Sequence, residues 1–437
     1  MSRSKVFRPT VLAALVVAGI VAVGANAAGT FVEPGVQVLH EFDSANPTGP
    51  NGSNFGWAVS ELKSVDGDQA DEVIVGEPFS TGGSTFVYSA RTGQQIYRFD
   101  GDPGDYNGFA MADAGDTNGD HVHDILVGAP GNDAGHVDLY SGKTGELLHR
   151  FSGESAGDTL GWAVSSAGDV DHDGRADVLL GAPAVFSGAN PGYAYIYSGR
   201  DYSLIRRLSG EVAGDQFGAG AGWSRDLNHD GVPDQIVGAR DAGPGARGRV
   251  YVFSGKTGER LFTLEAGPNG NQFGGYFVAG VGDVNRDGTP DVYAADYADT
   301  TNGGDINTTQ SGRAGVYSGK DGHELLSWVG EDASAGLGPG RGAGDVNHDG
   351  HPDLIIGSYS SNAGAPNAGR VQIFSGKDGS VLRTITSTTQ DEQFGFDAVG
   401  IGDVNRDGIP DALVAAANGN HVYVIAGART RGRDAAR

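Results

Sequence analysis

The chain has 437 residues, with 55 acidic side chains, 30 basic side chains and no cysteine. A net charge of −25 argues against nucleic acid or an anionic membrane surface as the partner, and the lack of cysteine excludes disulfides, thiolate metal sites and a lipoprotein anchor. Because 38% of the residues are hydrophobic and the 75 glycines far outnumber the 17 prolines, we expect a large folded core with many tight turns.

The N-terminus has the order of residues that is typical of a secretory signal. Basic residues precede the apolar stretch 11–24, and small residues follow it up to Ala27. This order predicts a signal peptide over residues 1–27 and a protein that is secreted, periplasmic or on the cell surface. A membrane anchor is the alternative, but the apolar stretch is short for a span and no later segment reaches that length. We therefore expect a mature chain without a transmembrane span.

A nine-residue acidic motif then recurs along the chain. In the run from Asp169 to Asp177, carboxylates stand at positions 1, 3, 5 and 9, and Gly174 at position 6 permits a sharp curl of the backbone. Oxygen donors that converge in this way fit Ca²⁺, which accepts six to eight oxygens. An EF-hand would close with Glu at position 12 between two helices, whereas here Asp closes at position 9 and an apolar strand pattern follows.

Six complete copies of the motif start 53, 57, 57, 62 and 58 residues apart. Their side-chain donors are Asp116, Asn118, Asp120 and Asp124; Asp169, Asp171, Asp173 and Asp177; Asp226, Asn228, Asp230 and Asp234; Asp283, Asn285, Asp287 and Asp291; Asp345, Asn347, Asp349 and Asp353; and Asp403, Asn405, Asp407 and Asp411. A degenerate copy from Ser64 to Asp71 precedes them. It is interpreted as one residue short and without the first carboxylate, and whether it binds calcium is left open.

Each copy belongs to a longer unit. Phe-Gly or Leu-Gly stands before the acidic motif, an apolar strand ending in Gly-Ala-Pro or a variant follows it, and a Ser-Gly-Lys-x-Gly turn such as 254–258 leads into a further strand. Four strands joined by tight turns predict one blade, and seven units at this period predict a propeller or a solenoid.

The two ends of the chain decide between these folds. The seventh unit lacks a fourth strand, whereas Val38–Phe42 near the N-terminus matches Leu147–Phe151, the fourth strand of another unit. This permuted match predicts an all-β, seven-bladed β-propeller of four-stranded antiparallel blades over residues 31–428, closed by an N-terminal strand that completes the last blade. Residues 429–437 are expected to form a basic, disordered tail.

Phe-Gly, the acidic motif and Gly-Ala-Pro together resemble the FG-GAP repeat of integrin α-subunit propellers and of exported bacterial proteins. The resemblance covers the whole predicted propeller. It implies about six structural Ca²⁺ sites in the hairpins between the first and second strands. It also implies that the seventh residue of each motif binds the ion through its backbone oxygen. These residues are Val122, Arg175, Val232, Thr289, His351 and Ile409.

The function expected from this resemblance is an extracellular binding or adhesion module for a protein or glycan ligand. The alternative is an extracellular hydrolase or lyase that acts on polysaccharide or lipid in the propeller mouth. The match of 153–157 to the nucleophile elbow G-x-S-x-G is interpreted as chance, because it lies between two predicted blades. No catalytic residue is assigned, and the four Trp residues are interpreted as core.

The ligand face is predicted to lie opposite the acidic motifs. There the connection between the second and third strands varies in length, and the longest one runs from Asp296 to Arg313 in the fifth blade. The candidate contact residues are Tyr359 in the next blade, Arg240 in the preceding blade and, in this connection, Tyr297, Asp299, Asn302, Asp305, Asn307 and Gln310. The alternative is that the long connection is a tolerated insertion with no role in binding.

Overall fold

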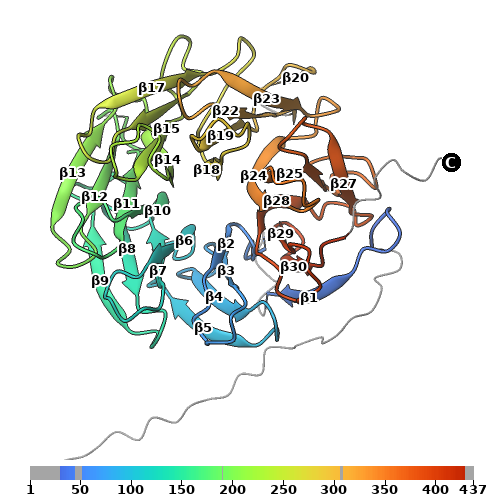
Figure 1. Ribbon diagram of the computed structural model, residues 1–437, viewed down its shortest axis with the longest axis horizontal. Coiled ribbons are helices and arrows are strands. Elements are labelled where there is room, and N and C mark those ends of the chain that lie inside the picture. The colour runs from blue at the N-terminus through green and yellow to red at the C-terminus, as the bar shows by residue number, and fades with distance from the viewer. Residues whose placement is uncertain (1–29, 45–51, 189, 306–308, 429–437) are drawn as a thin grey trace, which may run out of the picture.

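The computed structural model describes residues 30–44, 52–188, 190–305 and 309–428. Within these residues the regular elements are all β-strands, and they form seven four-stranded antiparallel sheets in a ring around a central axis (Figure 1). The prediction of an all-β, seven-bladed propeller is therefore confirmed. The predicted signal peptide at 1–27 and the predicted tail at 429–437 lie outside the described residues.

From the axis outward, blade 1 contains β2 (Val59–Leu62), β3 (Glu72–Glu77), β4 (Ser84–Ser89) and β5 (Gln95–Asp100), and blade 2 contains β6 (Ala110–Gly115), β7 (Asp124–Ala129), β8 (His136–Tyr140) and β9 (Leu147–Ser152). Blade 3 contains β10 (Ala163–Gly168), β11 (Asp177–Ala182), β12 (Tyr193–Tyr197) and β13 (Leu204–Ser209), and blade 4 contains β14 (Phe217–Ser224), β15 (Asp234–Ala239), β16 (Arg249–Phe253) and β17 (Arg260–Glu265). Blade 5 contains β18 (Val278–Gly282), β19 (Asp291–Asp296), β22 (Arg313–Tyr317) and β23 (Glu324–Val329), and a short hairpin of β20 (Gly304–Asp305) and β21 (Thr309–Gln310) lies between β19 and β22. Blade 6 contains β24 (Leu337–Gly344), β25 (Asp353–Ser358), β26 (Arg370–Phe374) and β27 (Val381–Thr386), and blade 7 contains β28 (Phe394–Gly400), β29 (Ala412–Ala416), β30 (His421–Ile425) and β1 (Val38–Asp43).

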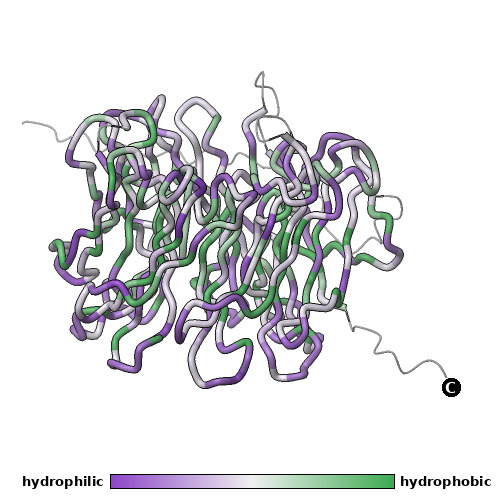
Figure 2. The backbone as a smooth tube through the Cα atoms, turned by 90° about the horizontal axis from the view of Figure 1, so that it is seen from above, coloured by the Kyte–Doolittle hydropathy of each residue, from purple (hydrophilic) through white to green (hydrophobic). Residues whose placement is uncertain are grey.

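The strands run between two loop-bearing faces of a disc, which Figure 2 shows from the side. Because neighbouring strands of a blade are antiparallel, the loop after each first strand and the turn after each third strand emerge on one face. We call this the acidic face, since it bears the acidic motifs. The connections after the second strands and between blades emerge on the opposite face.

The hydrophobic core lies between successive blades. Second strands are buried along their whole length, and their side chains alternate between the two neighbouring blades, as the period of a strand requires. In β3, for example, Val73 and Val75 pack in a cluster with Val422 of blade 7, whereas Ile74 packs in a cluster with Ile125 of blade 2. Each blade is therefore held by apolar contacts on both sides.

The two glycines of the repeated motifs mark the closest approach between blades. A Cβ atom on Gly128, in the Gly-Ala-Pro motif of blade 2, would lie 2.2 Å from the carbonyl oxygen of Gly161, in the Leu-Gly motif of blade 3. Gly181 and Gly218 repeat this contact at 2.1 Å between blades 3 and 4. Since Gly161 and Gly218 also have φ near +95° and +92°, both sides of the contact require glycine.

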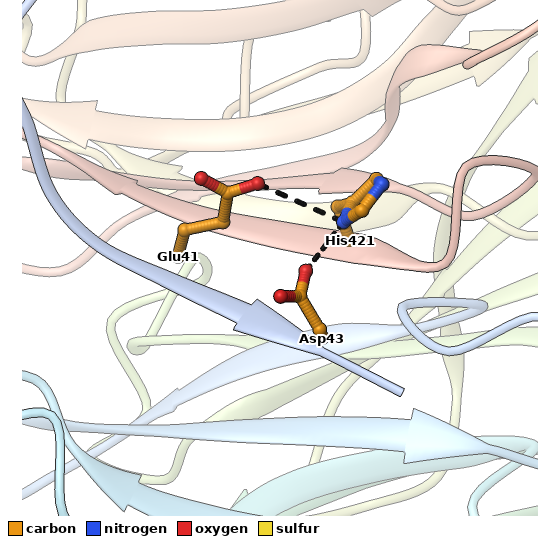
Figure 3. A group of neighbouring side chains, drawn as sticks. All are labelled: Glu41, Asp43 and His421. Carbon is orange, nitrogen blue, oxygen red and sulfur yellow. Dashed lines mark hydrogen bonds and ion pairs between the residues drawn. The ribbon is translucent and has the colours of Figure 1, made fainter. Parts of the chain in front are cut away.

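The N-terminal strand completes the last blade, as predicted. β1 pairs antiparallel with β30, and Phe42 lies opposite Val422. The imidazole Nδ1 of His421 lies 2.5 Å from Asp43 Oδ1 and 3.7 Å from Glu41 Oε1, so charged side chains also connect the two strands (Figure 3). The ring is thus closed where blade 7 meets blade 1, a junction that we call the seam.

Candidate functional site

The acidic motifs form seven hairpin loops on the acidic face, each between the first and second strands of a blade. In the loop of blade 3, Asp169 accepts hydrogen bonds from the backbone N–H groups of Asp173 and Gly174, both at 3.1 Å. Asp171 Oδ1 also accepts from Asp173 N at 3.0 Å, and Asp173 Oδ1 accepts from Arg175 N at 2.9 Å. The Asp side chains therefore stabilise the curled backbone of their own loop by accepting hydrogen bonds from its N–H groups.

The donor set of this loop fits a hard divalent cation. Asp169, Asp171 and Asp177 each offer a carboxylate oxygen, and these oxygens lie within 4.8 Å of one another. Carboxylates this close repel unless a cation lies among them, and an all-oxygen set in a flexible loop suits Ca²⁺ better than a transition metal. Asp169, Asp171, Asp173, Asp177 and the backbone oxygen of Arg175 would hold the ion.

In four loops with Asn at the third position, its amide group donates to a carboxylate of the same loop. Asn118 Nδ2 donates to Asp124 at 3.2 Å, and Asn285 Nδ2 donates to Asp287 at 3.2 Å. Asn347 and Asn405 make similar bonds of 3.3 Å. The structure thus brings the side chains expected from the sequence into one loop in these blades too.

The seventh side chains turn away from the loop centre, as expected for residues that present their backbone oxygen. Val232, Thr289 and Ile409 are buried, and His351 Nδ1 lies 2.7 Å from the carbonyl oxygen of Val284 in the neighbouring blade.

The ninth residue of each complete motif has a second partner that the sequence did not reveal. Asp177 Oδ2 accepts from Val170 N at 2.7 Å, and Oδ1 accepts from Gly199 N at 3.0 Å in the turn between the third and fourth strands. Asp124, Asp234, Asp291, Asp353 and Asp411 accept in the same way from Gly142, Gly255, Gly319, Gly376 and Gly427. Burial raises the pKa of Asp177 to about 6. This residue therefore ties the two turns of a blade together.

An experiment can distinguish an acidic residue that joins two turns, such as Asp177, from one that acts only within its loop, such as Asp173. We expect Asp177→Asn to lower the free energy of unfolding by about 1–3 kcal/mol even in excess EGTA, because an amide nitrogen cannot accept from Val170 N or Gly199 N. Asp173→Ala removes one partly buried turn bond and a cation ligand but no bond to the second turn, so it should matter in calcium and have little effect in EGTA. Urea unfolding of both variants in the two buffers checks this, and equal effects in EGTA would contradict it.

The loop of blade 1 corrects the interpretation from sequence. It is not one residue short: Glu72, the ninth residue from Ser64, accepts from Val65 N at 3.1 Å, as the ninth Asp does elsewhere. Asp71 instead pairs with Lys63 Nζ at 2.6 Å. Asp66, Asp68 and Glu72 offer oxygens within 4.8 Å of one another, and burial raises the pKa of Glu72 to about 8. The ninth residue is Asp in the complete motifs and Glu here, so the sequence pattern did not identify Glu72 as the ninth residue.

A cavity of about 690 Å³ lies on the axis and is lined by the innermost strands of the blades. At the opposite face its lining includes seven aromatic side chains, each in contact with the next, with ring centroids 4.6–6.4 Å apart. We call this circle the aromatic collar; its members are Trp57, Phe109, Trp162, Tyr276, Tyr297, Tyr359 and Phe396.

The fold places the collar at that face. Phe109 and Trp162 come directly before the first strands of their blades, and Trp57 comes two residues before β2. Tyr297 and Tyr359 come directly after second strands. First strands begin, and second strands end, on the face opposite the acidic loops. Tyr297 and Tyr359, predicted as contact residues, therefore lie at the channel mouth. Of the other candidates in the connection, Asp299 is buried and Asn307 lies outside the described residues. Arg240, the third candidate, donates to Tyr276 Oη at 3.3 Å.

The remaining collar residues were missed because each Trp or Phe looks like core when its unit is read alone. The signal was their position, since Trp57, Phe109, Trp162 and Phe396 each follow the glycine that opens the unit. The core interpretation is wrong for Trp57, Trp162 and Trp223, which line the cavity, and Trp223 is 37% exposed. Trp328 does pack against Phe374, with ring centroids 4.9 Å apart.

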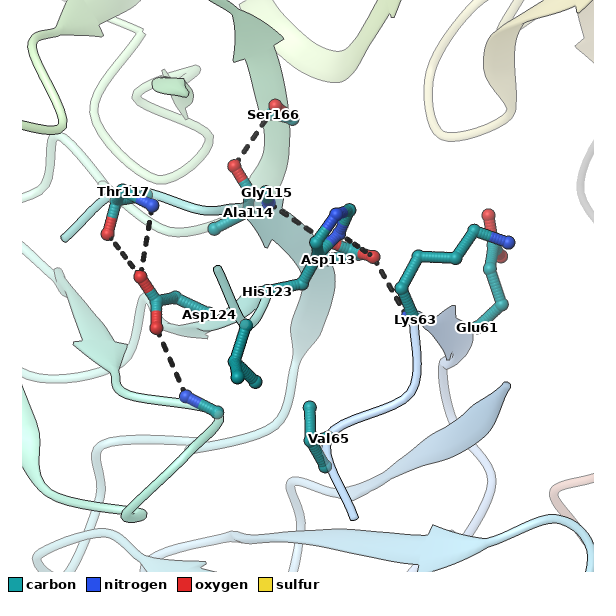
Figure 4. Close-up of polar contacts among 12 residues, drawn as sticks. Glu61, Lys63, Val65, Asp113, Ala114, Gly115, Thr117, His123, Asp124 and Ser166 are labelled. Carbon is teal, nitrogen blue, oxygen red and sulfur yellow. Dashed lines mark hydrogen bonds and ion pairs between the residues drawn. The ribbon is translucent and has the colours of Figure 1, made fainter. Parts of the chain in front are cut away.

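Charged groups line the cavity below the collar. Arg341 Nη2 donates to Asp397 Oδ1 at 2.6 Å. His123 Nδ1 lies 2.8 Å from Asp113, which also accepts from Lys63 N at 3.1 Å (Figure 4). Burial raises the pKa of Glu61, although Arg341 opposes this effect. Among the described residues that line the cavity, Glu61 Oε2 and Trp162 Nε1 are buried without a hydrogen-bond partner.

Comparison with known proteins gives matches to the "FG-GAP repeat" at residues 160–197 and 342–374 and to the "FG-GAP-like repeat" at residues 226–294. Integrin alpha-V of Gallus gallus is 28% identical over 208 residues, which are 43% of this chain and 20% of the integrin. Integrin alpha pat-2 of Caenorhabditis briggsae is 30% identical over 256 residues, which are 51% of this chain and 21% of the integrin. The matched region therefore spans about a fifth of these relatives. Within the described part of the chain, no helix has the length and apolar content needed to cross a membrane.

Proposed function

Because the chain is an FG-GAP-repeat, integrin α-like β-propeller, we propose that it is an extracellular, calcium-stabilised binding or adhesion module. Residues 1–27 would direct its export, residues 31–428 would form the module, and the six complete loops would hold structural Ca²⁺. The ligand would be an extracellular protein or glycan.

We propose that the ligand binds at the aromatic collar. Aromatic residues are enriched in binding surfaces because they bury a large area at a small cost in conformational entropy. The surface continues outward from Trp57 to Phe79, at 4.9 Å between ring centroids, and from Trp162 to Phe186, at 6.3 Å. Phe79 is 39% and Phe186 is 74% exposed, so the two side chains extend the collar into an exposed apolar patch, the kind of surface feature that marks a binding site.

The charged groups in the cavity favour binding over hydrolysis. A glycosidase needs two carboxyl groups that are free to act on the scissile bond. Here Asp397 is engaged by Arg341 and by Val59 N, and Asp113 is engaged by His123 and Lys63 N. Among these three acids only Glu61 keeps an oxygen without a hydrogen-bond partner.

We expect the double variant Trp57→Ala/Trp162→Ala to lose at least about tenfold in affinity for any ligand that the native protein binds, because truncated aromatic anchors cost roughly 2 kcal/mol or more. The measurement is a calcium-containing binding screen against immobilised matrix proteins and a glycan array. Trp328→Ala is the matched control, since it removes a Trp that lies outside the channel. Full binding by the double variant would exclude the collar.

A second variant separates the collar from the long connection of blade 5. Replacing residues 302–311 with a short Gly-Ser turn leaves the collar intact. Retained binding would assign recognition to the channel mouth, and lost binding would assign it to the connection, where Asn302 Nδ2 donates to the carbonyl oxygen of Gly330 at 2.7 Å.

A further inference from the structure

The fourth residue of the acidic loops has a strained backbone and a long side chain. His172, His229, Arg286, His348 and Arg406 occupy this position with φ between +58° and +64°. Glycine adopts this conformation without strain, and the loops of blades 1 and 2 do have Gly67 and Gly119 there. A residue other than glycine that adopts this strained backbone conformation often has a specific role.

Several of these side chains reach the loop of the next blade. Arg286 donates to the carbonyl oxygens of Asp349 and Gly350, both at 3.1 Å. His348 Nε2 lies 2.9 Å from the carbonyl oxygen of Gly408, and Arg406 Nη2 donates to that of Asp68 at 3.0 Å. The acceptors are the fifth and sixth residues of the next loop. These contacts run in one direction, from blade 5 through blades 6 and 7 to blade 1.

Where the fourth residue is glycine in blade 2, a neighbour fills its place. A Cβ atom on Gly119 would lie 0.8 Å from Nη1 of Arg175, which comes from the loop of blade 3. A guanidinium therefore occupies the space beside the fourth residue of the blade 2 loop, although it reaches backward by one blade, whereas nothing lies within 4 Å of such an atom on Gly67 in blade 1.

The contact of Arg406 differs from the others because it crosses the seam and meets a different loop. The blade 1 loop has Ser64 where the other loops have Asp. The carbonyl oxygen of Asp68 also accepts from Arg91 Nη1 at 3.2 Å, and Arg91 Nη1 lies 3.9 Å from the Asp68 carboxylate. Two guanidinium groups thus converge on a loop that has lost its first carboxylate.

We propose that fourth-position side chains transmit the cation occupancy of one loop to the next, and that Arg406 thereby clamps the blade 1 loop at the seam. The inference rests on the proposed calcium binding. Arg406 lies between Asn405 and Asp407, so an ion held by these two side chains fixes the backbone on both sides of it. An arginine that starts from a fixed backbone loses less conformational freedom when it binds Asp68.

The contacts of Arg406 and Arg91 with Asp68 also explain how the blade 1 loop could be stable without an ion of its own. Arg406 and Arg91 supply the positive charge that a cation supplies in the other loops, and their donors hold the backbone at Asp68. By reciprocity, the contact also raises the affinity of the blade 7 loop for its ion.

Hydrogen–deuterium exchange of the full chain, read by mass spectrometry with calcium and with EGTA, tests the proposal. In the native protein, calcium should slow exchange in residues 403–411 and, by about threefold, in residues 64–72, since an exposed charged contact contributes modestly. Arg406→Ala should keep the first effect and lose the second. Arg286→Ala, the matched control in blade 5, should keep both, and Asp407→Ala should lose both.

The failures can be told apart. If calcium slows exchange in none of the loops of the native protein, the proposed calcium binding is wrong. If it slows 403–411 but not 64–72, calcium binding stands and the clamp is wrong. If 64–72 is slowed equally in Arg406→Ala, the blade 1 loop binds its own ion and the clamp is again wrong.

Discussion

A chain that lacks residues 30–43 is expected to aggregate, because these residues contact both blade 7 and blade 1 at the seam. β1 forms the outer strand of blade 7, and its loss leaves β30 as an open edge that can pair with other chains. Phe42 stacks on Tyr88 of blade 1 at 4.2 Å between ring centroids, so the same deletion exposes apolar surface. Phe31 packs at 5.3 Å from Phe394 and would be lost as well.

Size-exclusion chromatography with light scattering measures this result directly. The single substitution Phe42→Ala should cost about 3–5 kcal/mol, the usual range for a buried Phe. Leu147→Ala is the control, because Leu147 is on the corresponding outer strand of blade 2 but is 50% exposed. We expect less than about 0.5 kcal/mol for that variant. A monomeric deletion variant with unchanged stability would show that the ring does not depend on β1.

The fold could be predicted from sequence because the repeat carries redundant information. Each unit repeats the glycines that neighbouring blades need for close approach, and the match of Val38–Phe42 to Leu147–Phe151 indicated the closure of the ring. Strand alternation then determines which side chains face each neighbour. These features are local in sequence or repeat at a fixed period, so no long-range information was needed.

The collar could not be predicted in the same way, since its seven members come from six blades and meet only when the ring closes. A single Trp57 or Trp162 has the same local pattern as a core residue. The blade 1 loop was misread for a different reason: Asp closes the six complete motifs, so Asp71 was expected to close this one, whereas Glu72 occupies the ninth position. The bonds from Gly199 to Asp177 and from Arg406 to Asp68 join separate turns or blades, which no spacing reveals.

Removal of calcium is the second change with a large expected effect. An ion bound only by the folded state stabilises it by about 2.7 kcal/mol when its concentration is one hundred times Kd, and six loops would contribute separately. Carboxylates such as Asp169 and Asp171, whose oxygens lie within 4.8 Å of each other, would then repel without a counter-ion. We therefore expect chelation to lower stability far more than any single loop substitution.

The most direct measurement is the thermal unfolding midpoint of the full chain in excess calcium and in excess EGTA, followed by scanning calorimetry. We expect the midpoint to fall by at least several degrees in EGTA and to recover when calcium is restored. Magnesium at the same concentration should restore less, because the flexible loops suit the larger ion. An identical midpoint in calcium and in EGTA would contradict the proposal that the acidic loops hold calcium and stabilise the propeller.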